Sequence, residues 1–198
     1  MSEDTSKVKI YDWNGTLITV EGFRAWVREA HPALAADFYG LDQDVRKAAT
    51  PDLKRVFEDA SNRGLYPCEL FPNVAKRLEQ DRQEGYARVV FSTVNQDTLD
   101  RQMCNFGIRQ NIDRIVSLDE VKQDGNLLDA VKEDPRVYGH LVTMLGVEKA
   151  RAYTDDTPAR AVAAVTAGVF DKVYLFDPEN KAKLGEGYAL IDDLMKAA

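Results

Sequence analysis

The side chains best suited to chemistry in this sequence stand at the ends of short apolar runs. Asp12 follows the run VKIY, and the pair Asp155-Asp156 follows the run ARAYT. Ser92 closes a third run, RVVFS. A carboxylate in such a position can attack phosphorus and form an aspartyl-phosphate, and further carboxylates supply the oxygen ligands that Mg²⁺ prefers. A lysine such as Lys132 would add positive charge opposite the phosphate, so together these residue types indicate phosphoryl transfer.

Alternating strands and helices must bring these residues together, because they lie far apart in the sequence. Hydrophobic patterning predicts five strands, a short sixth strand near the end of the chain, and helices between them. Such alternation is typical of an α/β protein whose parallel sheet is covered by helices on both faces, and ligands bind such sheets beyond the carboxyl ends of the strands. The expected strands are 7–12, 88–92, 113–117, 150–154, 172–176 and 188–191, and the expected helices between them are 72–84, 94–106, 135–145 and 158–167.

Local signals predict where some of these elements begin. Thr50 stands before Pro51 as an N-cap stands before a proline in the first turn of a helix. Thr93 and Gln96 have the spacing of a capping box at the start of the helix that follows the second strand. The polar segment 122–129 is expected to be a loop.

The segment 18–70 interrupts the alternation between the first and second strands. It has helical spacing, beginning with 21–30, and contains no convincing strand, so we interpret it as a small helical insertion. The expected organisation is a sheet domain of residues 1–17 and 71–198 and a helical cap of residues 18–70. The length of 198 residues is enough for one domain with such an insertion, at ~100–200 residues per domain.

Composition and charge argue against several other classes of protein. The chain has 44% hydrophobic and 30% charged residues, as a globular protein does and a disordered one does not. Its net charge of −7 argues against nucleic acid as a partner. The first residues are too hydrophilic for a signal peptide, and the longest apolar stretch, 161–170, has about half the length of a membrane span. The two cysteines fit neither a disulfide framework nor a zinc site, so we expect a soluble cytoplasmic protein that binds no membrane.

Four segments, in order, resemble the motifs of the haloacid dehalogenase (HAD) superfamily of hydrolases. The segment 12–17, DWNGTL, is similar to the first motif, usually DxDGTL, and Ser92 in RVVFST to the second. The segment 132–138, KEDPRVY, is similar to the lysine motif, commonly KPDPxxY, and 153–157, YTDDT, to the acidic fourth motif. The resemblance covers essentially the whole chain. It implies a Rossmann-like core with strand order 5-4-1-2-3, and it gives 18–70 the position of a C1-type cap.

The resemblance also implies roles for individual residues. Asp12 would be the nucleophile and, with the backbone carbonyl of Asn14, a ligand of Mg²⁺. Asp156 would align with the metal-binding aspartate of the family and Asp155 with a glycine, and either could contact the metal. Lys132, with Lys122 as an alternative, would offset charge, and Thr16 would support the first motif. Ser92 and Thr93 would bind phosphoryl oxygens, and Arg24 would contact the substrate.

Two positions depart from the family pattern. Asn14 stands where family phosphatases have the aspartate that protonates the leaving oxygen and then activates water, and an asparagine can do neither. General acid–base catalysis of this kind is typically worth ~10²–10⁴-fold in rate. Arg160 stands where many members have a second acidic residue, for which Asp155 would compensate.

The expected function is Mg²⁺-dependent hydrolysis of a small phosphorylated metabolite, through an aspartyl-phosphate on Asp12, by a monomer or a homodimer. Because of Asn14, three alternatives stay open: a HAD-type dehalogenase, a phosphonate hydrolase, and a catalytically weak relative that binds a phospho-ligand or a protein. Dehalogenases typically carry an aromatic residue at the position of Asn14 and need no metal. Phosphonate hydrolysis requires a cap lysine that forms a Schiff base, and the lysines of the expected cap are Lys47 and Lys54.

Overall fold

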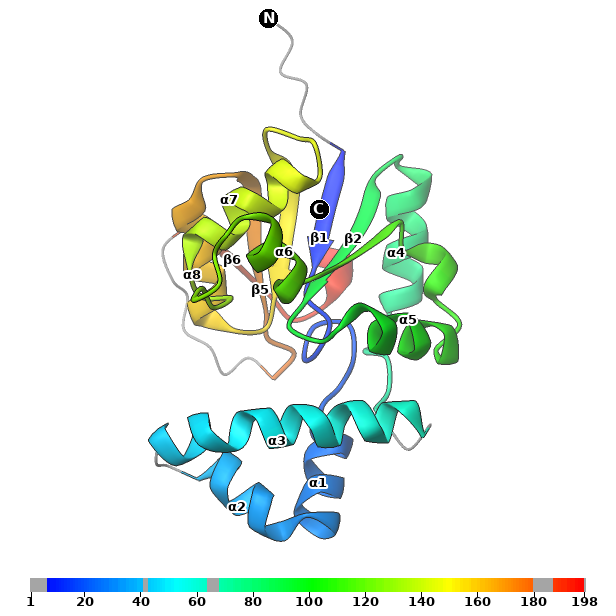
Figure 1. Cartoon of the computed structure of the whole chain (residues 1–198). Coiled ribbons are helices and arrows are strands. Elements are labelled where there is room, and N and C mark those ends of the chain that lie inside the picture. The colour runs from blue at the N-terminus through cyan, green and yellow to red at the C-terminus, as the bar shows by residue number, and fades with distance from the viewer. Residues whose placement is uncertain (1–6, 41–42, 64–67, 180–186, 198) are drawn as a thin grey trace, which may run out of the picture.

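A single parallel sheet forms the centre of the molecule (Figure 1). The computed structural model describes the chain except for residues 1–6, 41–42, 64–67, 180–186 and 198. Within the described residues the strand order is β3-β2-β1-β4-β5-β6, and every neighbouring pair is parallel. The predicted order 5-4-1-2-3 is therefore present, and the sixth strand extends it beside β5. The strands are β1 (Val8–Tyr11), β2 (Ala87–Ser92), β3 (Arg114–Ser117), β4 (Ala150–Asp155), β5 (Phe170–Phe176) and β6 (Ala189–Ile191).

Helices cover both faces of the sheet, which confirms the predicted α/β fold. Successive side chains of a strand point to opposite faces, so Ile10 belongs to the apolar core under α6, α7 and α8, and Tyr11 to the core under α4 and α5. No helix in the described part of the chain is long and apolar enough to cross a membrane. The helices are α4 (Val74–Gln83), α5 (Gln96–Asn105), α6 (Leu118–Asp124), α7 (Pro135–Met144) and α8 (Pro158–Ala167), with short 3₁₀ turns at Arg109–Asn111 and Leu194–Lys196.

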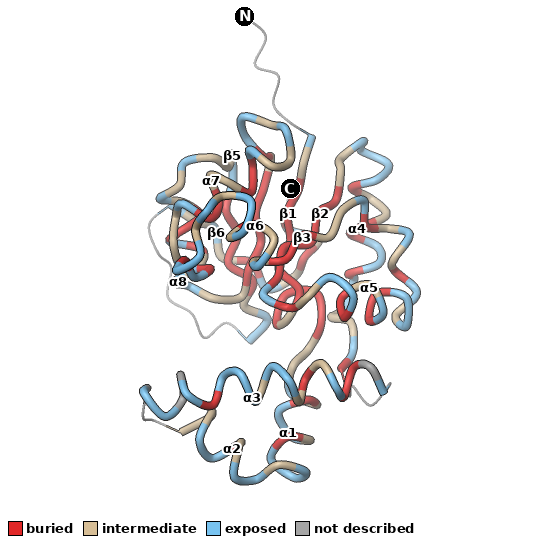
Figure 2. Tube along the Cα trace, in the orientation of Figure 1, coloured by how far each residue is buried: buried red, intermediate tan, exposed pale blue. Residues whose placement is uncertain are grey.

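Three helices between β1 and β2 form a separate layer beyond the carboxyl ends of the strands (Figure 1). The two chain segments that lead into and out of this layer pair with each other, since Ile18 forms an antiparallel bridge with Leu70 and the Thr19 amide donates to the Glu69 carbonyl at 2.8 Å. Figure 2 shows that the strands are mostly buried, whereas these helices expose much of their outer surface. The helices are α1 (Glu21–Ala30), α2 (Pro32–Tyr39) and α3 (Gln43–Asn62).

Pro51 lies inside α3 and not in a first turn, so the prediction that Thr50 is an N-cap was wrong. A proline inside a helix removes one backbone hydrogen bond and crowds the preceding turn. The 20 residues of α3 nevertheless form one helix, which packs against both α2 and α5. Tertiary packing along its length thus outweighs the local helix-breaking tendency.

The N-cap of α5 is Asn95 and not Thr93, as the capping-box spacing had suggested. The Asn95 side-chain oxygen accepts the amide of Thr98 at 2.9 Å, so it satisfies one of the free amides in the first turn. Asparagine caps as well as threonine does. The loop between β2 and α5 is therefore longer than the spacing predicted.

The segment 122–129, predicted to be a loop, begins inside the short helix α6. The Ser117 side chain caps this helix by accepting the amide of Glu120 at 3.1 Å. Val121 is its one buried residue. Two apolar residues, Leu118 and Val121, are too few in seven residues to give a periodic signal in the sequence, so the cap and the contacts with β3 and α7 define this helix.

Candidate functional site

Asp12 lies where β1 ends, at the carboxyl edge of the sheet. Strand β1 pairs with β2 on one side and with β4 on the other, and the Asp12 amide donates to the Thr154 carbonyl at 2.8 Å. The ends of three neighbouring strands therefore meet here, which brings Asp12, Ser92 and Asp155 together. All three side chains are buried.

Lys132 is the buried cation of this site. Its ammonium forms an ion pair with Asp12 Oδ1, lies 3.0 Å from Asp155 Oδ2 and donates to the Phe91 carbonyl at 3.1 Å. Only 1% of Lys132 is exposed, and a charge buried this deeply requires such partners. Lys122, the alternative, lies on α6, where it is half-buried.

Both oxygens of the Asp155 carboxylate already have partners. Oδ1 accepts the Thr157 amide at 2.9 Å and lies 3.8 Å from Arg160 Nη1, and Oδ2 accepts the Tyr153 hydroxyl and faces Lys132. Burial alone would raise the pKa of Asp155, but the positive charges of Lys132 and Arg160 outweigh burial and hold that pKa below its usual value. Asp155 is therefore a fixed anion between two cations.

Asp156 lies against the loop that follows Asp12. Gly15 in this loop has a φ of +84°, and a Cβ there would collide with the Asp156 carboxylate, so only glycine allows the approach. Burial, together with the negative charges of Asp12 and Asp155, raises the pKa of Asp156 to about 7. Burial also raises the pKa of Asp12, against the opposing effect of Lys132.

The donor atoms at this edge fit a divalent cation. Asp12, Asp155 and Asp156 each offer an oxygen within 4.8 Å of the others. Asp12 Oδ2 is buried and has no hydrogen-bond partner among the described residues, a costly arrangement unless a ligand completes it. Carboxylate oxygens are the ligands that Mg²⁺ prefers. The residues present therefore fit Mg²⁺.

A cavity of about 540 Å³ lies between the sheet edge and helices α1–α3. This volume suits a small organic ligand. The core side of the wall is polar, and the side formed by the three helices carries aromatic residues and two cations. Lining residues from the core are Asp12, Asn14, Ser92, Thr93, Val94, Leu118, Asp119, Asp156, Thr157 and Arg160, and those from the inserted segment include Phe23, Arg24, Phe38, Tyr39, Lys54, Phe57 and Glu58.

The structure does not place every expected site residue on the cavity wall. Thr16 and Lys132 are buried and do not line the cavity. Ser92 lines it, and its hydroxyl accepts the Val94 amide at 3.2 Å. Arg24 lines it from α1 with a half-exposed side chain.

Several lining residues were not expected from the sequence. Arg160 was marked only as a departure from a family motif, and the signal that could have found it is its position one helical turn after Asp156. Phe38 and Tyr39 carry no such signal, because apolar residues on α2 are explained equally well by packing. Lys54 lines the cavity, whereas the side chain of Lys47 lies outside the described residues.

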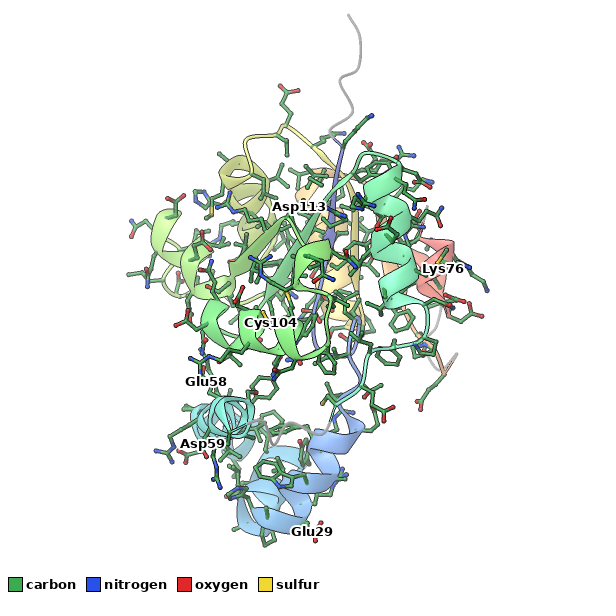
Figure 3. The ribbon with its side chains drawn as sticks, turned by 90° about the vertical axis from the view of Figure 1, so that its right-hand side faces the viewer. Glu29, Glu58, Asp59, Lys76, Cys104 and Asp113 are labelled. Atoms are coloured by element: carbon green, nitrogen blue, oxygen red, sulfur yellow. The ribbon has the colours of Figure 1, made fainter. Side chains whose placement is uncertain are left out.

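Three side chains on one face of α3 bond to the core. They are spaced four and three residues apart, which aligns them along a helix. Figure 3 shows Glu58 on the side of α3 that faces the core. The bonded pairs are Lys54 with Asp119 at 3.3 Å, Glu58 with Asn95 at 2.6 Å, and Ser61 with Gln102 at 2.8 Å.

A family model for haloacid dehalogenase-like hydrolases matches residues 31–171, which is more than half of the chain. The chain belongs to this family, and it is a HAD-like hydrolase. No curated protein matches its sequence.

Solved structures confirm the fold over the whole length of the chain. A dehalogenase with an intermediate complex has a TM-score of 0.71 at 16% identity, covering 98% of this chain and 96% of that one. A HAD phosphatase from Thermococcus onnurineus has a TM-score of 0.71 at 16% identity, covering 96% and 95%. The putative HAD hydrolase YfnB from Bacillus subtilis, bound to magnesium, has a TM-score of 0.68 at 10% identity, covering 98% and 97%. At these identities the likeness concerns the fold alone.

Proposed function

We propose that this protein is a Mg²⁺-dependent hydrolase of small phosphate esters that acts through an aspartyl-phosphate on Asp12. The observation that carries this proposal is the state of the Asp12 carboxylate. Lys132 holds its Oδ1, while its Oδ2 is buried without a partner among the described residues, and Asp12 borders a ligand-sized cavity. Such a carboxylate is oriented for attack on a group bound in that cavity.

Asp12, Asp156 and the backbone carbonyl of Asn14 would hold the metal. Asp155 is the less suitable of the two neighbouring carboxylates because Lys132, Arg160 and two hydrogen bonds already occupy its oxygens. When bound, Mg²⁺ supplies the positive charge that allows a phosphate dianion to approach the nucleophile.

The remaining residues position the phosphoryl group and limit turnover. Ser92 and Thr93, at the end of β2, would donate hydrogen bonds to phosphoryl oxygens. Thr16 would support the loop that follows Asp12. Asn14 borders the cavity but cannot protonate a leaving oxygen. We therefore propose that the enzyme favours esters with stable leaving groups, such as aryl phosphates, over alkyl phosphates.

The layer of helices α1–α3 would act as a C1-type cap, formed by residues 18–70 inserted into a core of 1–17 and 71–198. It supplies the part of the cavity wall that lies opposite the nucleophile, so it would select the substrate. We propose a small phosphorylated metabolite as that substrate and a monomer or homodimer in the cytoplasm as the working form, with no nucleic acid or membrane as partner.

The proposal is tested by assaying the purified protein on an aryl phosphate in Mg²⁺ and in EDTA, beside Asp12→Asn and Asn14→Asp. We expect Mg²⁺-dependent turnover that Asp12→Asn abolishes and that Asn14→Asp increases on alkyl phosphates by about 10-fold or more, because it restores a general acid. Turnover seen only in Asn14→Asp would contradict the hydrolase and favour a protein that binds phospho-ligands.

Phosphonate hydrolysis is the second candidate, because Lys54 of α3 lines the same cavity as Asp12. That reaction would require the Lys54 amine to form a Schiff base with an aldehyde on the substrate. Borohydride trapping of an aldehyde-bearing phosphonate, lost in Lys54→Arg, would support it. Halide release from a 2-haloacid in EDTA would instead indicate a dehalogenase.

A further inference from the structure

Arg160 has a position that the proposed chemistry does not yet explain. It lines the cavity beside Asp12 and Asp156, and 77% of its side chain is removed from solvent, since 23% remains exposed. It is the third residue of α8, where a positive charge opposes the helix dipole. A cation placed in the first turn of a helix therefore gains nothing from the helix itself.

Glu133 holds the guanidinium at one end. Arg160 Nε donates to Glu133 Oε1 at 3.0 Å, and Glu133 is the residue that follows Lys132 in the chain. Among the described residues, neither Nη atom donates a hydrogen bond, and Asp155 Oδ1 lies 3.8 Å from Nη1. Lys132, which is shared between Asp12 and Asp155, is the nearer cation to Asp155 at 3.0 Å. Arg160 therefore adds positive charge to this group of carboxylates without using its Nη atoms for a hydrogen bond to any of them.

We propose that Arg160 binds two oxygens of the transferred phosphoryl group through its Nη atoms, and that Glu133 is the positioning residue that aims it. This inference rests on the proposed function and names a residue for its phosphate subsite. The planar fork of a guanidinium matches two oxygens of a phosphate, which an ammonium cannot do. A carboxylate at this position would only add negative charge, whereas Arg160 brings a second cation to a site that already holds three carboxylates.

The test is titration calorimetry of the full-length protein with inorganic phosphate, in Mg²⁺ and in EDTA. We expect Arg160→Met to weaken phosphate binding by about 10- to 100-fold in Mg²⁺, as the loss of a charge-assisted pair does. Part of the wild-type affinity should persist in EDTA and vanish in Arg160→Met. Arg160→Lys should recover only part of the loss, and Glu133→Gln should show a smaller loss with a rise in KM for aryl phosphate.

Arg136→Met is the matched control, because Arg136 is an exposed arginine paired with Asp134 outside the cavity. It should bind phosphate as the wild type does. Phosphate binding that is equal in wild type, Arg160→Met and Arg160→Lys would overturn the inference, as would a wild type that binds no phosphate or binds acetate more tightly. If Arg160→Met fails to fold, Arg160→Lys and Glu133→Gln decide alone.

The inference and the proposed function fail in different ways. Phosphate binding that depends on Arg160, in a protein that hydrolyses no phosphate ester, would support the subsite and contradict the hydrolase. Turnover of phosphate esters with KM and phosphate affinity unchanged in Arg160→Met would support the hydrolase and contradict the subsite.

Discussion

At the scale of single residues, the site depends on charges that are buried and matched. Lys132 contacts Asp12 and Asp155 at once, so one ammonium holds the proposed nucleophile and its neighbouring anion in place. No cation among the described residues forms an ion pair with Asp156, and burial together with the negative charges of Asp12 and Asp155 raises its pKa to about 7. The two adjacent carboxylates of the YTDDT segment therefore have different electrostatic states.

Replacing Lys132 by methionine should destabilise the protein strongly. It leaves Asp12 and Asp155 buried without their shared cation, and breaking a buried ion pair from one side typically costs about 3–5 kcal/mol. Urea unfolding of Lys132→Met measures this loss. Lys122→Met is the control and should change the free energy of unfolding by no more than about 0.5 kcal/mol, and an equal effect of both variants would contradict the assignment.

Without metal, the ionisation of Asp156 should destabilise the fold as pH rises. Its pKa rises from 3.8 to about 7 on folding, so between these values the folded state keeps a proton that the unfolded state has released. The stabilising effect of the neutral form is complete below about pH 4 and is lost as pH rises through 7. In EDTA, the free energy of unfolding should therefore fall between pH 5 and pH 8 by more in the wild type than in Asp156→Asn. Parallel pH profiles for the two proteins would show that this site is not the cause.

At the scale of elements, α3 connects the inserted helices to the core. Its Ser61 accepts a hydrogen bond from Gln102 of α5, and Gln102 accepts one from the indole of Trp13 at 2.6 Å. Ser61 in turn donates to the carbonyl of Phe57, a residue of the cavity wall. This chain of buried hydrogen bonds joins the residue next to the nucleophile to the helix that covers it.

Gln102→Leu should loosen that connection. The Trp13 indole would lose its buried acceptor and Ser61 a donor, and a buried polar group without its partner costs about 1–3 kcal/mol. We expect this loss in urea unfolding, with faster amide exchange in α3 than in α7. Gln110→Leu is the matched control, because Gln110 is exposed and its amide donates only to the carbonyl of Gly107; exchange that rises equally in both helices would point to global destabilisation instead.

At the scale of the whole molecule, a net charge of −7 coexists with a site proposed to bind an anion. The two are compatible because the charges near the site, rather than the net charge, determine whether an anion binds there. Lys132, Arg160 and a bound cation would offset the carboxylates around Asp12. The cavity is lined both by residues of the core and by residues of helices α1–α3, so a ligand there contacts both.

Ligands of this cavity should therefore stabilise the whole protein. Mg²⁺ and inorganic phosphate, added together, should raise the melting temperature. A ligand that binds only the folded state, at a concentration of 100 times its Kd, adds about 2.7 kcal/mol to the free energy of unfolding. The increase should be smaller in EDTA and reduced in Asp156→Asn. Potassium chloride at equal ionic strength is the control for a general salt effect, and an identical rise with it would contradict specific binding.

Much of the core architecture could be predicted because its signals are local. An apolar run followed by a polar residue marks the end of a strand, and parallel strands align their ends at one edge whatever the length of chain between them. That rule was enough to group Asp12, Ser92 and Asp155. The prediction of helices from local signals failed for α3, where packing maintains the helix through Pro51. It also failed for α6, a seven-residue helix in which Val121 is the one buried residue.

The sequence by itself determined the alternation of strands and helices and the set of carboxylates at the ends of the strands, since these follow from the types and spacing of neighbouring residues. The strand order was implied by the resemblance of four motifs to those of the HAD superfamily. The tertiary structure alone decided which lysine is buried against Asp12, which of two adjacent aspartates is already neutralised, and which side chains of α1–α3 line the cavity. Those outcomes depend on contacts between residues far apart in the chain, where burial and distance, rather than residue type, set the energy of each charge.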